Sequence, residues 1–226
     1  MKCWAEGVSD CCDRQSREHY ITKGLFSGKT VKVSGVSGIL PFLNGEELTM
    51  PKASLTRKCL CSKHNSLLSP FDEEAINFAK SLEYANKLSM ERSADKRKKL
   101  PVHYKYSDAD AFSRWIIKTY INMLEFFPKP SLISEHDLAN LVFSRGKVTK
   151  YVSYQVSMDI GDEFQVAETV GIAPMMTDIA TVGISIWIYG INIQCLIHDS
   201  PISNGKLPKI KFNDHGKGLS CVVGLK

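Results

Sequence analysis

The chain has 226 residues, of which 43% are hydrophobic and 23% charged, and its formal net charge is +5. This composition is ordinary for a soluble globular protein with one large or two small domains. The longest apolar stretch, residues 181–197, is interrupted by Gly, Ser, Asn and Gln and is too broken to span a bilayer. No N-terminal signal segment is visible, so we expect a cytoplasmic protein with no membrane partner.

The charge and the cysteines are unevenly distributed. Residues 1–100 contain 17 Lys+Arg against 12 Asp+Glu, whereas residues 101–226 contain 12 of each. Five of the seven cysteines also precede residue 62, which favours metal binding over disulfides in a protein without a signal segment. Cys195 and Cys221, each flanked by apolar residues, are expected to be buried thiols. A basic excess beside a metal site suits a polyanion such as nucleic acid.

The first regular elements are short strands and one long helix. β-Branched residues predict strands at Val31–Val36 and around Leu55–Leu60. A helix should then begin after Ser69, which can act as its N-cap, and continue to about Met90. The basic segment Arg92–Lys99 follows as a linker or as the solvated end of this helix.

The second half begins helical and then changes to strands. Apolar spacing predicts a helix over residues 107–127, and a short helix from Ser134 to about Phe143 has Ser134 and Asp137 placed as a capping box. The β-branched segments that follow predict strands; these are Val148–Met158, Phe164–Val170, Val182–Ile188 and Ile191–Ile197, with shorter ones at Ile210–Phe212 and Leu219–Val223.

These elements predict an α+β fold in two parts. Residues 1–91 would form a zinc-stapled module and residues 92–106 a basic linker. Residues 107–226 would form an α+β domain with antiparallel strands, to which no motif assigns a role.

The cysteines before residue 62 have the spacing of a structural zinc site. Cys61-x-x-His64 lies just ahead of the predicted helix, as in the second half of a treble clef. The first pair combines Cys3 with Cys11 or Cys12, across a loop of seven or eight residues. Cys59 is a further candidate, because it would share a strand face with Cys61.

Between and beside these ligands lie a carboxylate, an imidazole and an amide. Glu18 directly precedes His19, and Asn65 directly follows the second ligand pair. These groups can bind a hard divalent cation and activate a water, as a ββα-metal site requires. The alternative is that His19 is a hydrogen-bonded core histidine and that Asn65 caps a turn.

The strings S-R-E-H-Y-I and K-C-L-C-S-K-H-N-S-L-L-S-P-F-D resemble the zinc-containing HNH endonucleases of the ββα-metal, treble-clef group, most closely an uncharacterised bacterial set. The resemblance covers about residues 3–75. It implies His19 as the general base, a structural Zn²⁺ and a catalytic Mg²⁺ or Mn²⁺. The implied zinc ligands are Cys3, Cys11, Cys61 and His64, and the implied ligands of the catalytic metal are Glu18 and Asn65.

The chain departs from the family pattern at two places. Glu18 stands where the family has an aspartate, and the central asparagine has only Asn44 as a candidate. We nevertheless expect phosphodiester hydrolysis of nucleic acid, with DNA favoured, in which His19 takes a proton from the attacking water. Nearby cations would contact the substrate, namely Arg17, Lys23 and Lys63.

Two other functions fit the same residues. The module could be a non-catalytic zinc unit that binds nucleic acid or a partner protein. Alternatively, the chain could be a regulated effector in phage defence, working as an oligomer or with an effector partner, with residues 107–226 as its sensor.

Overall fold

The computed structural model describes residues 3–26, 28–34, 47–93, 100–158, 170–203, 206–213 and 219–226. Within these ranges the chain is mixed α+β, as predicted. The helices are α1 (Ser62–Leu67), α2 (Ser69–Ser93), α3 (Ala109–Met123) and α4 (Glu135–Phe143). The strands are β1 (Gln15–His19), β2 (Thr30–Ser34), β3 (Glu47–Pro51), β4 (Thr56–Cys61), β5 (His103–Ser107), β6 (Val152–Met158), β7 (Val170–Met176), β8 (Thr181–Ile188), β9 (Ile191–Ile197), β10 (Lys209–Asn213) and β11 (Leu219–Leu225).

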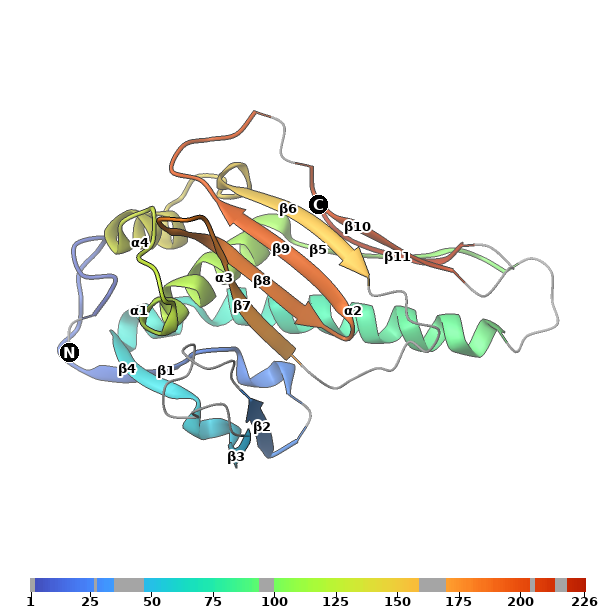
Figure 1. Ribbon diagram of the computed structural model, residues 1–226, viewed down its shortest axis with the longest axis horizontal. Helices are drawn as coiled ribbons and strands as arrows, with labels where there is room; N and C mark the ends of the chain where they lie inside the picture. The colour runs from blue at the N-terminus through green and yellow to red at the C-terminus, as the bar shows by residue number, and fades with distance from the viewer. Residues whose placement is uncertain are drawn as a thin grey trace.

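The N-terminal part contains two small antiparallel sheets, β1–β4 and β2–β3, beside the long helix α2 (Figure 1). The strands predicted at Val31–Val36 and around Leu55–Leu60 correspond to β2 and β4. The predicted helix starts and ends are also close to those observed, and Ser134 caps α4 by accepting the backbone N–H of Asp137. Asn44, residues 94–99 and most of the strand predicted at 164–170 lie outside the described residues.

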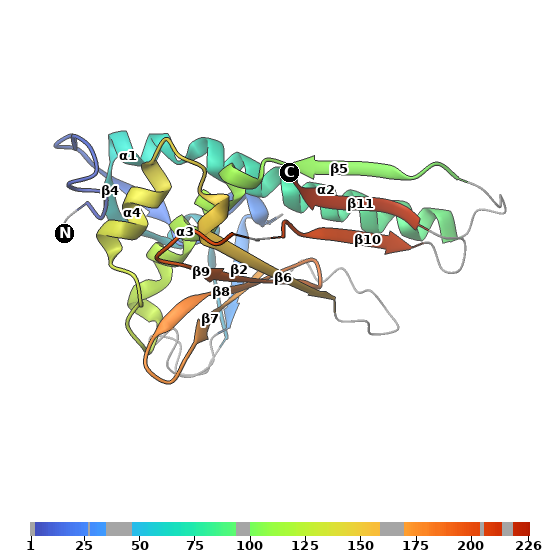
Figure 2. The same ribbon diagram turned by 90° about the horizontal axis from the view of Figure 1, so that it is seen from above.

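A three-stranded sheet in the order β10-β11-β5 runs along α2 (Figure 2). Its strand β5 lies within residues 92–106, where the sequence predicted a linker. The segment His103–Ser107 alternates tyrosines with polar residues, but the alternation covers only five residues and follows a basic run, so the segment is interpreted from sequence as a linker. It is extended because it pairs in parallel with β11, more than a hundred residues later in the chain.

The second large sheet is antiparallel, in the order β6-β9-β8-β7. Its edge strand β7 was not predicted, since it includes Gly171 and Pro174. Proline cannot donate to a strand ladder and is tolerated at a sheet edge, where one side of the strand needs no partner.

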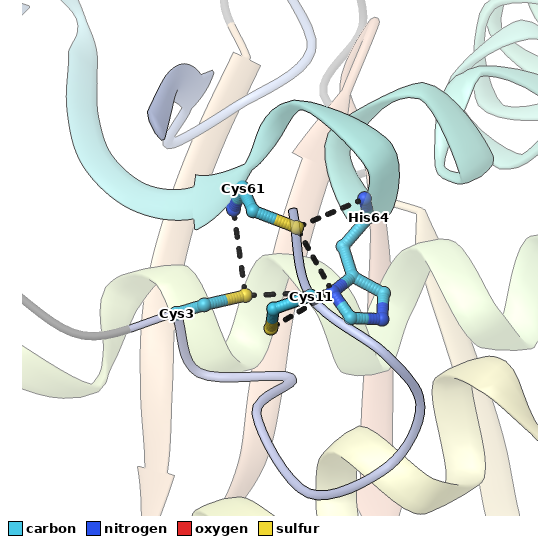
Figure 3. Close-up of side chains that lie close together, drawn as sticks. All are labelled: Cys3, Cys11, Cys61 and His64. Carbon is cyan, nitrogen blue, oxygen red and sulfur yellow. Dashed lines mark hydrogen bonds between the residues drawn. The ribbon is translucent and has the colours of Figure 1, made fainter. Parts of the chain in front are cut away.

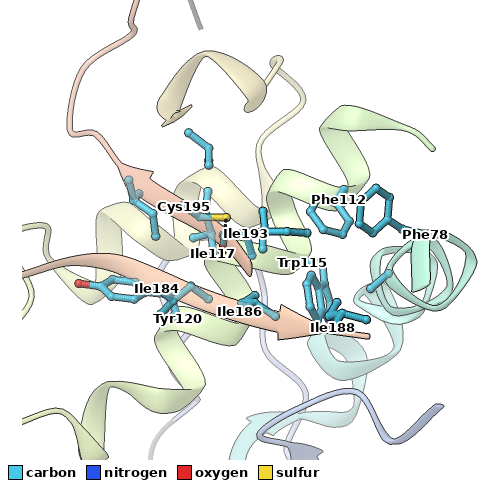
Figure 4. Close-up of a cluster of buried hydrophobic side chains, with 14 of the residues drawn as sticks. Phe78, Phe112, Trp115, Ile117, Tyr120, Ile184, Ile186, Ile188, Ile193 and Cys195 are labelled. Atoms are coloured by element: carbon cyan, nitrogen blue, oxygen red, sulfur yellow. Dashed lines mark hydrogen bonds between the residues drawn. The ribbon is translucent and has the colours of Figure 1, made fainter. Parts of the chain in front are cut away.

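Helix α3 packs against this sheet and forms the centre of the core (Figure 4). From Phe112 to Met123 every residue of the helix is buried, because α2, α4 and β8 surround it. The contact with the sheet consists of large apolar side chains: Trp115, Ile117 and Tyr120 from α3, and Ile184, Ile186 and Ile193 from β8 and β9.

Buried residues from Trp4 to Leu225 belong to one continuous apolar cluster. The cluster includes side chains from residues 1–91 and from residues 107–226, so the division into two domains stays a prediction. Among the described residues, no helix has the length and the hydropathy needed to cross a membrane.

Replacing Gly183 by alanine is expected to lower the free energy of unfolding by about 1–3 kcal/mol. The new Cβ would overlap the carbonyl oxygen of Cys195 on β9, and this oxygen is part of the sheet backbone and cannot move aside freely. Urea denaturation followed by circular dichroism measures the change. The matched control is Gly146→Ala, where no atom lies within 4 Å of the added Cβ. Equal stabilities of the two variants would contradict the close approach of β8 and β9.

Candidate metal centre

Four soft ligands converge where β4 meets α1 (Figure 3). Cys61 ends β4, His64 lies in the first turn of α1, and Cys3 and Cys11 come from the N-terminal loop. One ligand atom from each of the four lies within 4.8 Å of every other. Sequence and structure therefore agree on Cys3, Cys11, Cys61 and His64 as a candidate metal site.

The distances within the cluster match tetrahedral zinc. The Nδ1 atom of His64 lies 3.2 Å from the Sγ atom of Cys61, 3.5 Å from that of Cys3 and 3.7 Å from that of Cys11. Ordinary Zn–S and Zn–N bond lengths place such atoms about 3.6 Å apart around a tetrahedral ion. The other ring nitrogen, Nε2, is 2.7 Å from the Oγ atom of Ser9, and such a partner holds the imidazole with Nδ1 toward a metal.

The start of α1 supplies backbone donors to the sulfurs. Cys61 is the N-cap of the helix, and its Sγ atom accepts the N–H of His64 at 3.5 Å. The Sγ atom of Cys3 accepts the N–H of Cys61 at 3.4 Å. Desolvation would raise the pKa of Cys61, but backbone N–H groups of His64 and Cys12, the Cys12 thiol and the His64 imidazole outweigh it and lower that pKa to about 6. Desolvation and the neighbouring thiol of Cys3 raise the pKa of Cys11 to about 12.

The N-terminal loop is folded tightly enough to bring Cys3 and Cys11 together. The N–H of Glu6 donates to the carbonyl of Cys3 at 2.9 Å, and Gly7 has a φ of 91°, a left-handed conformation that favours glycine. The N–H of Trp4 donates to the carbonyl of Cys59 at 3.0 Å, which fixes the loop to β4. A compact turn therefore replaces the short C-x-x-C spacing usual for zinc ligands.

The two other candidate cysteines lie outside the cluster. The Sγ atom of Cys12 accepts the N–H of Lys63 at 3.4 Å. Ser16 pairs with Leu60 and Arg17 with Lys58, so Cys59 has no partner on β1 and is the extra residue of a β-bulge. The bulge interrupts the alternation of side chains along β4, so Cys59 does not share a face with Cys61. The Sγ atom of Cys59 instead lies 3.8 Å from the Oδ1 atom of Asn122 on α3.

Glu18, implied as a catalytic metal ligand, faces the protein interior. It is 4% exposed, and its Oε1 atom lies 2.5 Å from the Nζ atom of Lys118 on α3. Lys118 is fully buried and also pairs with Asp72 at 2.7 Å. Burial raises the pKa of Glu18 despite the opposing effect of Lys118. Burial alone would lower the pKa of Lys118, but the two carboxylates outweigh it and raise that pKa.

The sequence did not indicate this ion-pair network. Asp72 also accepts a hydrogen bond from the hydroxyl of Thr22, and Thr22 accepts the indole N–H of Trp115 at 2.8 Å. The one available signal was Lys118 itself, a lysine in the middle of a helix with apolar residues on several faces. A lone lysine in a helix is usually solvated, so only the tertiary structure shows that it is buried.

His19 is partly buried at the end of β1. Its Nε2 atom is shielded from solvent and has no hydrogen-bond partner among the described residues. Desolvation lowers the pKa of His19, and the charges of Lys23 and Lys118 lower it further. The imidazole is therefore neutral at neutral pH and has a nitrogen able to accept a proton.

Asn65 connects α1 to β1. Its Nδ2 atom donates to the Oγ atom of Ser16 at 2.8 Å and to the carbonyl of Arg17 at 3.2 Å. Since Asn65 faces β1 and Glu18 faces α3, no described contact brings the two implied ligands of the catalytic metal together. The three cations expected to contact substrate are all exposed: Arg17, Lys23 and Lys63.

Comparison with known proteins adds no relative: no protein-family model matches the chain, and no curated protein or solved structure is significantly similar to it.

We expect the purified protein to contain one tightly bound zinc ion per chain, measurable by inductively coupled plasma mass spectrometry. Cys61→Ala or His64→Ala should release it and unfold the surrounding strands, because structural zinc contributes on the order of 10 kcal/mol to such folds. Cys11→Ser should also lose zinc. Cys12→Ser is the matched control and should retain it, since its sulfur lies outside the cluster. A protein without zinc that resists chelators would contradict the assignment.

Lys118→Met is expected to lower the free energy of unfolding by about 3–5 kcal/mol, because it leaves a buried carboxylate without its counter-charge. Adding Glu18→Gln in the same chain should recover part of the loss, which distinguishes charge compensation from packing. Lys80→Met, at an exposed position of α2, is the control and should change the stability by less than about 0.5 kcal/mol. Chemical denaturation measures the free energy of unfolding of all three variants. If Lys118→Met alone unfolded with the same free energy as the parent, the ion pairs of Lys118 would contribute nothing to stability.

Proposed function

We propose that the chain is a metal-dependent endonuclease of the HNH type, acting on phosphodiester bonds of nucleic acid, with DNA as the favoured substrate. The observation that carries the proposal is the four-ligand cluster at the β4–α1 junction, on the same strand pair that ends in His19. A zinc ion there would do no chemistry. It would hold together strands and a short helix that are too small to form a core alone.

His19 is the proposed general base. A base must be neutral before it can accept the proton of the attacking water, and the lowered pKa of His19 favours the neutral form. Its Nε2 atom has no described hydrogen-bond partner, but it is shielded from solvent, so the site would have to open before the attacking water could reach this nitrogen. The exposed cations Arg17, Lys23 and Lys63 would bind phosphates and orient the strand.

The residues present do not form a ready site for the catalytic Mg²⁺ or Mn²⁺. The carboxylate of Glu18 is held by Lys118, so a cation there would have to displace a buried ammonium. The amide nitrogen of Asn65 donates to β1, which leaves its Oδ1 atom as the possible metal ligand, but no described contact brings this atom near Glu18. We therefore assign no step to this metal, and the proposed chemistry rests on His19 and on the binding of phosphates.

These same contacts favour a second candidate, a non-catalytic zinc module that binds nucleic acid or a partner protein. In that case Glu18 and Asn65 are structural residues, which is how their intramolecular contacts use them. Binding would be retained, but no residue would be needed to activate water.

Nicking of supercoiled plasmid in Mg²⁺ or Mn²⁺ separates the two functions. His19→Ala should reduce the cleavage rate at least ~10²-fold, the usual contribution of a positioned general base. Because folding lowers the pKa of His19, the cleavage rate should stay constant down to the ordinary imidazole value of about 6.5 and fall only below it. Binding should persist, with affinity falling as salt rises.

His136→Ala provides the matched control, since His136 is exposed on α4 and no described hydrogen bond or ion pair connects it to β1. It should cleave as fast as the parent protein. Cleavage by His19→Ala at the parental rate would move the active site elsewhere. If the parent itself does not cleave but still binds, the non-catalytic module is the better description.

A further inference from the structure

One face of the β10-β11-β5 sheet is basic and aromatic. In the strand register Tyr104 lies opposite Val222, which lies opposite Lys211, and Tyr106 lies opposite Gly224, which lies opposite Lys209. Paired residues of neighbouring strands project to the same side of a sheet. These six residues therefore share one face of the sheet, and none of the six is acidic.

The opposite face of the sheet is packed against α2. Ile210, Cys221 and Val223, at the alternate positions of β10 and β11, are at most 2% exposed. His103 and Lys105 also face the helix, because the Nδ1 atom of His103 is 2.7 Å from the hydroxyl of Tyr84, and the Nζ atom of Lys105 lies over that ring. The Tyr104 face therefore points away from α2, and the three strands can be followed along the helix in Figure 2.

The two tyrosine rings form an exposed platform. Tyr104 is 60% exposed and Tyr106 is 38% exposed, although side chains of this size are usually covered. Their centroids are 6.5 Å apart with an interplanar angle of 15°, so both rings present roughly parallel faces. A Cβ on Gly224 would lie 3.3 Å from both the Tyr106 ring and the side chain of Lys209. The carbonyl oxygen of Pro208 would lie closer still, at 3.0 Å, so glycine at this position lets the Tyr106 ring and the Lys209 side chain pack closely over β11.

Lysines surround the rings. Lys209 and Lys211 are exposed on β10, which is separated from the tyrosine strand β5 by β11, and the Nζ atom of Lys226 lies 5.5 Å from the centroid of the Tyr106 ring. The sequence did not indicate this concentration, because residues 101–226 carry equal numbers of basic and acidic residues. Folding places three of these lysines beside two tyrosines.

We propose that this face, consisting of Tyr104, Tyr106, Lys209, Lys211 and Lys226, binds single-stranded nucleic acid. Bases stack on exposed aromatic rings whatever their identity, and lysines contact the phosphates that connect them. A duplex hides its base faces and has no use for the tyrosines, and an acidic protein surface would need only the lysines. The combination of both residue types favours a single strand.

A strand bound here would be the substrate of the proposed nuclease, so this choice of substrate class rests on the proposed function. The binding itself does not involve His19, which lies on β1 in a different sheet. Substitutions of Tyr104 and Tyr106 test strand binding, whereas His19→Ala tests cleavage, so the two proposals can be judged separately.

The test is fluorescence anisotropy with labelled 15-nucleotide single strands of DNA and RNA, without added Mg²⁺ or Mn²⁺. Tyr104→Ala with Tyr106→Ala should weaken binding by at least about fivefold per ring removed. Tyr104→Phe with Tyr106→Phe should bind like the parent, because phenylalanine keeps the stacking surface. Lys209→Ala with Lys211→Ala should reduce the slope of log affinity against log salt by about 1.4, the value for two phosphate contacts on a single strand.

Three controls make the result decisive. Lys80→Ala with Lys147→Ala removes two exposed lysines elsewhere and should leave the affinity unchanged. An abasic strand should bind the parent as weakly as a normal strand binds the double alanine variant of the tyrosines. A duplex of the same length should be insensitive to that variant. The proposal is overturned if the tyrosine variant binds like the parent, or if heparin, which has charge but no bases, shows the same dependence on the tyrosines.

Discussion

A fully buried ammonium group has to be compensated by nearby carboxylates, and Lys118 meets this requirement by joining three elements. Its Nζ atom contacts Glu18 on β1 and Asp72 at the start of α2, while its own helix α3 forms the centre of the core. The positions of β1 and α2 around α3 are therefore set by charge as well as by packing. The strand that ends in His19 belongs to this arrangement.

The candidate metal centre has a complementary role at the other end of the same strand pair. Two strands alone are marginally stable in water, and within the described residues β1 and β4 form a sheet of two strands. A metal bound by the four ligands would join the end of β4 to α1 and to the N-terminal loop, while Lys118 joins β1 to α3. Held at both ends, the pair positions His19 without a large core of its own.

This arrangement also explains why Glu18 is a poor candidate for a hard metal ion. A carboxylate that neutralises a buried lysine cannot leave it without exposing the uncompensated charge of Lys118. Stability and metal binding would compete for the same oxygen atoms. His19 has no such conflict, because its Nε2 atom has no described partner. If catalysis occurs here, the imidazole is the group free to take part.

The sequence alone determined the local features. Caps, apolar spacing and β-branched runs predicted most helices and strands, including the start of α4 at Ser134, because these signals depend on neighbouring residues. The soft ligands Cys3, Cys61 and His64 followed from residue type and spacing, whereas Cys11 was preferred to Cys12 only through the family resemblance.

Only the tertiary structure decided what depends on distant partners. Strand β5 exists because β11 pairs with it, and Cys59 is excluded from the metal centre by a bulge opposite β1. The burial of Lys118 and the grouping of Tyr104 with Lys209 likewise depend on elements far apart in the chain. Local sequence cannot show such features, because the free energy that stabilises them comes from contacts that form only when the chain is folded.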